Sequence, residues 1–284
     1  MASNIPKDLK QTTDSIGSFI MTMKNYFDDG IDEAIAFGHR LYIEKVVNGE
    51  KVDPNIRFFL SRYKKLKKKE KRKRDIADKA RDFLEDNAKP EDITEDWMDF
   101  FFEKAKLVTS NEMQLIWSQL LAEEANNPGS ISLSLLHSLS IMTYEQAEFF
   151  CNMSRFALRE FKKESVNLLI FYSKNRKAYK SSHIDDKKLK TLERLGLIVC
   201  DFKDEFIFEK KKIFTAGNKM LTILGDTHNK KKIKAGNAEF TADGQLLYRI
   251  IDNSYKGYDS RIVDFIISEF KERGCHVLVD NLEV

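Results

Sequence analysis

Hydrophobic residues recur at helical spacing through the first half of this chain. Between residues 8 and 48 the apolar positions lie three or four residues apart, which predicts helix, and Gly30 and Gly38 are the two positions at which a break is expected. Asp53 followed by Pro54 is the residue pair expected at a helix N-cap and first turn. We therefore expect long helices here, with one running from Asp53 to about Leu84.

The segment from 92 to 160 has the most regular pattern. One face carries apolar residues at i, i+3, i+4, i+7 and i+8, namely Met113, Ile116, Trp117, Leu120 and Leu121. Thr109 precedes Glu112 by three residues and Thr143 precedes Gln146 by three, so each pair predicts a capping box at a helix start. Short helices joined by short loops indicate a compact bundle of antiparallel neighbours.

Aromatic residues concentrate in the same segment. Trp97, Phe100, Phe101 and Trp117 share core-facing positions, which is typical of a hydrophobic core. Phe102 points off this face, so we expect it to contact a second element, either the N-terminal helices or another subunit.

After residue 160 short strands alternate with helices. The apolar segment 165–173 is predicted to be a helix, with a strand over 168–172 as the alternative. A helix over 183–195 is expected to end at Gly196 and to lead into a strand. Residues alternate from Lys212 to Leu224 around a turn, which predicts a β-hairpin. A helix, a second helix and a hairpin in this order are typical of a winged helix-turn-helix.

These patterns predict a mainly α protein, a helical bundle with a C-terminal α+β winged-helix-like region. We expect long N-terminal helices over 1–88, a central helical bundle over 89–160 and the winged-helix-like region over 161–284.

Charge is distributed unevenly along the chain. The 284 residues carry a net charge of +3. Residues 62–74 contain ten basic residues and one acidic residue, which gives this basic segment +9 and leaves −6 for the rest. Such a block attracts polyanions, either nucleic acid or anionic lipid headgroups. A solvated helix face, an acidic protein partner and a nuclear localisation signal are the alternatives.

The expected winged helix supplies a second basic surface, because its recognition helix would face phosphates. The candidate polyanion-binding residues from both regions are Lys64, Lys65, Lys67, Lys68, Lys69, Lys71, Arg72, Lys73, Arg74, Lys187, Lys188, Lys190 and Arg194.

Motifs of catalysis and cofactor binding are missing from the sequence. It has no phosphate-binding glycine loop, no GxSxG motif, five scattered histidines and three isolated cysteines. Asp204, Glu209 and Lys211 outline a metal-dependent nuclease motif, which we retain as an alternative. We otherwise predict no catalytic residue, no metal ligand and no cofactor. With no signal peptide and no membrane-spanning run, a cytoplasmic location is expected.

Residues 74 to 250 carry a family resemblance. Its motif includes Asp96-Trp97, Glu112-Met113-Gln114, Ile116-Trp117, Pro128-Gly129-Ser130 and Phe240-Thr241. This combination resembles a bacterial family known as domain of unknown function 2806. The central helices are more loosely similar to bacterial abortive-infection alpha proteins, which act in phage defence. The first resemblance implies a bacterial source and supplies no catalytic residues, and the basic segment lies before the matched part.

The sequence therefore favours a non-enzymatic binding or regulatory protein of a bacterial cell. The resemblance implies a phage-defence component that acts through recognition of a polyanion or a protein partner, with a homo-oligomer also expected. The alternatives are a winged-helix DNA-binding regulator without a defence role and the metal-dependent nuclease.

Overall fold

The computed structural model of this chain describes residues 7–27, 30–161, 166–168, 184–200, 207–208, 211–216, 219–225, 233–234, 236, 238–254 and 260–281. The chain forms two compact units, residues 1–140 and 141–284. The predicted central bundle, 89–160, therefore extends from the first unit into the second.

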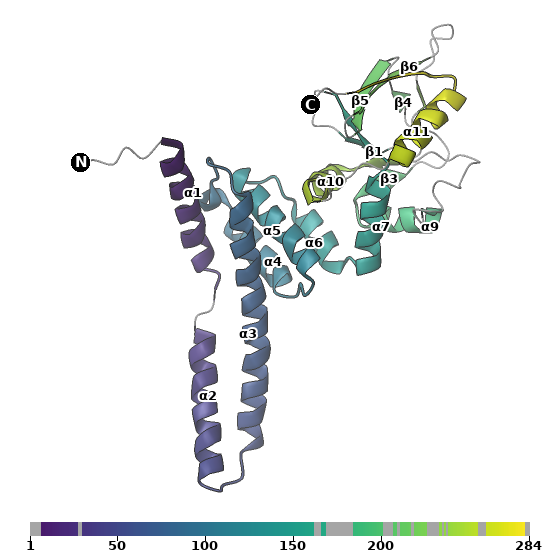
Figure 1. Cartoon of the computed structure of the whole chain (residues 1–284). Coiled ribbons are helices and arrows are strands. Elements are labelled where there is room, and N and C mark those ends of the chain that lie inside the picture. The colour runs from purple at the N-terminus through teal and green to yellow at the C-terminus, as the bar shows by residue number, and fades with distance from the viewer. Residues whose placement is uncertain are drawn as a thin grey trace. The chain divides into compact units, whose positions relative to one another are not determined.

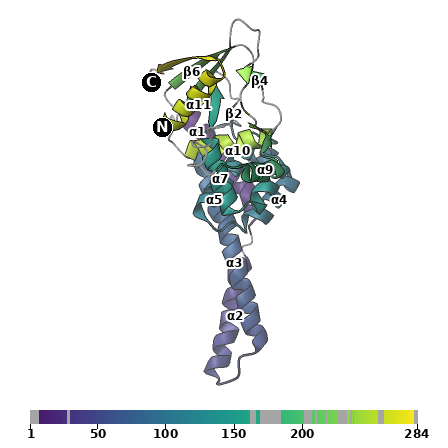
Figure 2. The same ribbon diagram turned by 90° about the vertical axis from the view of Figure 1, so that its right-hand side faces the viewer.

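Long helices open the first unit, as the sequence predicts. They are α1 (Lys7–Lys24), α2 (Gly30–Val47) and α3 (Pro54–Ala80). The helix that begins at Pro54 passes through the whole basic segment without a break, and its 27 residues span about 40 Å. In Figure 1 and Figure 2, α2 and the first part of α3 lie side by side and extend beyond the other helices of this unit. We call residues 30–68 the arm.

Local chemistry explains how the arm forms. The side chain of Asp53 accepts a hydrogen bond from the backbone N–H of Asn55 at 2.8 Å, which caps the exposed start of α3. Gly38 lets the two helices approach closely, because a Cβ there would lie 2.7 Å from the ring of Phe59 and 2.8 Å from Leu60. α2 and α3 therefore pack tightly against each other at Gly38.

The rest of the first unit is a bundle of short helices. Its elements are η1 (Arg81–Phe83), η2 (Pro90–Asp92), α4 (Glu95–Ala105), α5 (Asn111–Asn126) and α6 (Leu133–Ile141). The predicted apolar face of α5 supplies its core, since Trp117, Leu120 and Leu121 are fully buried. The indole N–H of Trp97 donates to the carbonyl of Ile131 at 2.9 Å, which ties α4 to the loop before α6.

Two detailed predictions for this unit have different outcomes. Phe102 does contact the N-terminal part, because its ring stacks on Tyr26 at 5.5 Å between centroids and meets Phe27 at 5.9 Å. The capping box predicted at Thr109 is wrong. Ser110 is the N-cap of α5, and its hydroxyl accepts from the backbone N–H of Met113 at 3.2 Å.

The second unit combines helices with small antiparallel sheets. Its helices are α7 (Tyr144–Ser154), α9 (Asp186–Arg194), α10 (Ala242–Ser254) and α11 (Ser260–Glu272). Its strands are β1 (Ala157–Glu160), β2 (Val166–Leu168), β3 (Ile198–Cys200), β4 (Ile207–Phe208), β5 (Lys211–Ala216), β6 (Lys219–Leu224), β7 (Ile233–Lys234), β8 (Ala238–Phe240) and β9 (His276–Asn281). Five strands pair in the order β2-β1-β5-β6-β9, with β3–β8 and β4–β7 as separate pairs.

The strands confirm the predicted hairpin and correct one predicted helix. β5 and β6 pair from Lys211↔Leu224 to Ala216↔Lys219, as the alternation predicts. Residues 166–168, expected to be helical, instead form β2, because they pair with β1 from Ala157↔Leu168 to Arg159↔Val166. Residues 169–173 of that predicted helix lie outside the described part of the chain.

The junction between β8 and α10 is fixed to the chain that follows α9. Thr241 donates from its hydroxyl to the carbonyl of Gly196 at 2.6 Å and from its N–H to that of Leu197 at 3.2 Å. Gly244 packs so close to the Leu197 carbonyl that a Cβ would lie 1.8 Å from its oxygen. The chain that leaves α9 is therefore clamped against the start of α10.

The observed architecture is mainly α with small antiparallel sheets, as expected at the level of fold class. Across the described residues, no helix has both the length and the apolar character needed to cross a bilayer.

Candidate polyanion-binding site

The second half of the basic segment holds α3 against its own unit. Arg72 donates to the carbonyl of Lys106 at 3.2 Å, and Lys73 donates to the carbonyl of Tyr26. Lys73 also pairs with Glu70 at 2.9 Å, and the Arg74 guanidinium lies 4.7 Å from the centroid of Phe27. These half-buried cations have structural partners, so they are poor candidates for a free binding surface.

Two further cations of the segment are partly neutralised. Lys67 pairs with Asp32 of α2 at 2.6 Å across the arm. The Lys69 charge acts on Glu103, whose pKa is lowered first by the hydrogen bond from Lys106 and then by the charges of Lys106, Lys73 and Lys69. Both lysines therefore contribute less to an external field than their sequence position suggests.

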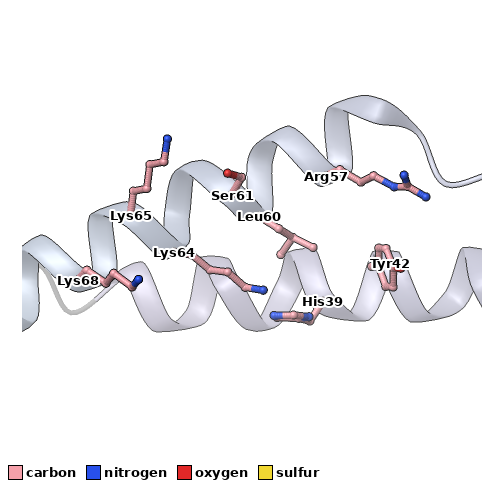
Figure 3. Close-up of a pocket in the computed structure, with 8 residues that line it drawn as sticks. All are labelled: His39, Tyr42, Arg57, Leu60, Ser61, Lys64, Lys65 and Lys68. Carbon is pink, nitrogen blue, oxygen red and sulfur yellow. The ribbon is translucent and has the colours of Figure 1, made fainter.

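Four lysines of the segment remain exposed. Lys64, Lys65, Lys68 and Lys71 are all exposed, and none of them has an acidic partner within the described residues. Three of these four lysines line a concavity of about 630 Å³ between α2 and α3, which Figure 3 shows. The residues that line it are His39, Tyr42, Arg57, Leu60, Ser61, Lys64, Lys65 and Lys68.

Helical spacing produces this arrangement. Arg57, Ser61, Lys64, Lys65 and Lys68 recur three or four residues apart and so share one side of α3. At 1.5 Å per residue, the row from Arg57 to Lys68 is about 16 Å long. Four cations and no carboxylate line the concavity, so every charged group of its lining is positive, with His39 as a further titratable group.

Sequence reasoning missed five of the eight lining residues, namely His39, Tyr42, Arg57, Leu60 and Ser61. Arg57 lies before the basic segment, although its position seven residues before Lys64 places it on the same helix face. His39 and Tyr42 come from α2, and only the pairing of α2 with α3 brings them to the lysines. α2 and α3 pair because they approach closely at Gly38, and no local sequence motif predicts this approach.

The second predicted set of cations lies on α9, in the second unit. Asp185 caps this helix by accepting from the N–H of Lys188 at 2.9 Å. Leu189 and Leu192 are buried, whereas the four predicted binding residues are exposed: Lys187, Lys188, Lys190 and Arg194. The Lys188 ammonium lies 5.4 Å from the ring centroid of Phe149 and so makes a cation–π contact with α7.

Catalytic chemistry gains no geometric support from the described residues. Asp204 and Glu209 of the nuclease alternative lie outside them, and Lys211 is an exposed residue of β5. Within the ranges that the structure describes, no three His, Cys, Asp or Glu residues cluster as a metal site would require. Burial raises the pKa of the Cys151 and Cys275 thiols and raises that of Cys200 to about 12, so all three are poor nucleophiles.

The fold and the site define a mainly helical protein with a projecting basic arm. The family model described as "Protein of unknown function (DUF2806)" matches residues 59–257, and the chain belongs to this family. The match begins earlier than the sequence resemblance, so it includes the basic segment. No curated protein and no solved structure is significantly similar to the chain.

Proposed function

We propose that this protein is a non-enzymatic nucleic-acid-binding module that binds phosphates through the arm. The observation that carries the proposal is the row of Arg57, Lys64, Lys65 and Lys68, whose charges line one concavity without a carboxylate. Neighbouring cations of the same segment are engaged within the protein, as Lys67 is with Asp32. Lysines and arginines that stay exposed on a projecting element are suited to contact a phosphate backbone.

The test is binding of a short fluorescent DNA duplex, measured by anisotropy over a range of salt concentrations. We expect affinity to fall steeply with salt, because each phosphate contact releases condensed counterions. The triple variant K64Q/K65Q/K68Q should weaken binding and flatten the slope of log affinity against log salt by about 2–3. Its folding should be intact, since these side chains are exposed and removing like charges relieves repulsion.

A matched control separates a local site from general charge. Lys24, Lys89 and Lys271 are exposed and lie outside the arm, so K24Q/K89Q/K271Q removes the same charge. The control variant should keep most of the wild-type affinity and slope. Equal losses in the two triple variants, or no loss in either, would refute the proposal.

A second candidate is DNA binding through α9, as in a winged helix. The order of α9, the antiparallel β3–β8 pair and α10 supports it, with the exposed cations on the outer side of α9. In the same assay, K187Q/K190Q/R194Q should then reduce affinity for duplex DNA more than K64Q/K65Q/K68Q does.

The cellular role that we propose is phage defence, and its support is the resemblance of the central helices to abortive-infection alpha proteins. Phage plating efficiency on native-host cells with and without the gene tests this role. Identical plating over a broad phage panel would refute it and leave the binding proposal standing.

A further inference from the structure

The concavity of the arm has an apolar floor, formed by Tyr42 and Leu60, as well as a rim of cations. Leu60 is only 7% exposed and Tyr42 is half-buried, so together they offer an apolar and aromatic surface between the helices. In Figure 3 the Lys64 side chain extends toward His39, whereas Lys65 extends away from α2. The site therefore combines the Tyr42 ring and a small apolar area at Leu60 with cations that extend in different directions.

Duplex nucleic acid would use only part of this combination. Its bases are stacked inside the helix and its outer surface presents phosphates, which would use the rim and leave the floor empty. A single strand exposes both groups, a base with an apolar face and the phosphates that flank it. At about 630 Å³, the concavity is within the size range of sites that enclose small organic groups.

We infer that this concavity binds single-stranded nucleic acid, with one base against Tyr42 and Leu60 and the adjoining phosphates on Arg57, Lys64 and Lys68. This inference rests on the proposed function and names its ligand class. Base stacking on an aromatic ring tolerates any sequence, because every base has a π-face. The arm should therefore prefer single strands over duplexes and show little sequence preference.

The experiment compares a labelled thymidine oligonucleotide with a duplex of equal length by anisotropy in the same salt. The wild-type chain should bind the single strand more tightly. Tyr42→Ala should lower single-strand affinity by ~10-fold and leave duplex affinity nearly unchanged, whereas Tyr42→Phe should keep the wild-type preference. Tyr144 is an exposed tyrosine in α7, so Tyr144→Ala is the matched control and should have no effect.

Circular dichroism checks that Tyr42→Ala folds, and crosslinking of a photoreactive oligonucleotide to the wild-type chain gives a second readout. The crosslinked peptide should come from residues 39–68. Equal affinity for both nucleic acids with no effect of Tyr42→Ala would overturn the inference but leave the proposed function. Binding to neither nucleic acid would overturn both.

Discussion

Replacement of Gly244 by alanine tests how the second unit is held together. A Cβ at this position would lie 1.8 Å from the carbonyl oxygen of Leu197 and 2.9 Å from its carbonyl carbon. The nearest atoms belong to the backbone, so no side-chain rotation relieves the contact. The start of α10 must therefore move away from β3 by ~1 Å or more to reach ordinary contact distance.

That movement breaks the clamp at the start of α10. Thr241 makes two hydrogen bonds to the chain before β3, at 2.6 and 3.2 Å, and both depend on the same close approach. Losing them costs about 1 kcal/mol each, and forced repacking adds about 1–3 kcal/mol. Alanine returns up to ~1 kcal/mol in helix propensity. We expect Gly244→Ala to lower the free energy of unfolding by about 2–4 kcal/mol.

The two units can be followed separately. The chain has two tryptophans, Trp97 and Trp117, and both lie in the first unit. Tryptophan fluorescence in urea therefore reports on the first unit, and hydrogen exchange of α10 peptides reports on the second. Gly244→Ala should shift α10 exchange and leave the fluorescence transition near its wild-type midpoint.

Gly17 provides the matched control. It lies in α1, and a methyl group added to its Cα would have no neighbouring atom within 4 Å. Gly17→Ala should therefore be neutral or stabilising by up to ~1 kcal/mol. If Gly244→Ala keeps wild-type exchange protection in α10, the close approach to Leu197 is refuted.

Three further predictions concern single side chains. Burial raises the pKa of Glu124, whose carboxylate accepts backbone N–H donors near 2.8 Å, so its contribution to the free energy of unfolding falls as pH rises above its unfolded-state pKa. In urea unfolding from pH 4 to 7, the wild-type free energy of unfolding should therefore fall relative to that of Glu124→Gln, and parallel pH curves would contradict this. Thr143→Ala removes a capping box in the second unit and should cost about 1 kcal/mol, measured by hydrogen exchange of α7 peptides, whereas Thr109→Ala should change the stability of the first unit by less than ~0.5 kcal/mol in the urea assay. Burial raises the pKa of the Cys200 thiol to about 12, so this thiol should be alkylated at pH 8 far more slowly than free cysteine. Mass spectrometry measures the two rates, and equal rates would contradict the burial of Cys200.

Helix boundaries follow from the sequence where one residue type decides them locally. Asp53 and Pro54 fix the start of α3, and the pairing of Thr143 with Gln146 fixes that of α7. The sequence does not decide a boundary where two neighbouring residues can both cap the helix. Thr109 and Ser110 both carry a hydroxyl that can cap, and the observed cap is one residue later than the pattern suggests.

Pairing and packing partners outside a segment explain what its own sequence did not predict. Residues 166–168 form a strand because β1 offers unpaired backbone groups to them, a partner that local periodicity cannot reveal. The same holds for the binding site. The basic segment is evident in the sequence, but the division of its cations into anchored and exposed sets depends on Asp32, Tyr26 and Phe27.

The helical state of the basic segment itself carries a cost that bears on function. Five pairs of basic residues stand four apart in α3, at 64/68, 65/69, 67/71, 68/72 and 69/73. At about 0.2–0.5 kcal/mol for each like-charge pair, repulsion opposes the helix by roughly 1–2.5 kcal/mol. Buried Leu60 before these charges and buried Ile76 after them hold the helix at both ends. If the arm binds a polyanion as we propose, the bound charge would offset the repulsion in the middle, so the same charges that weaken the free arm would strengthen that complex.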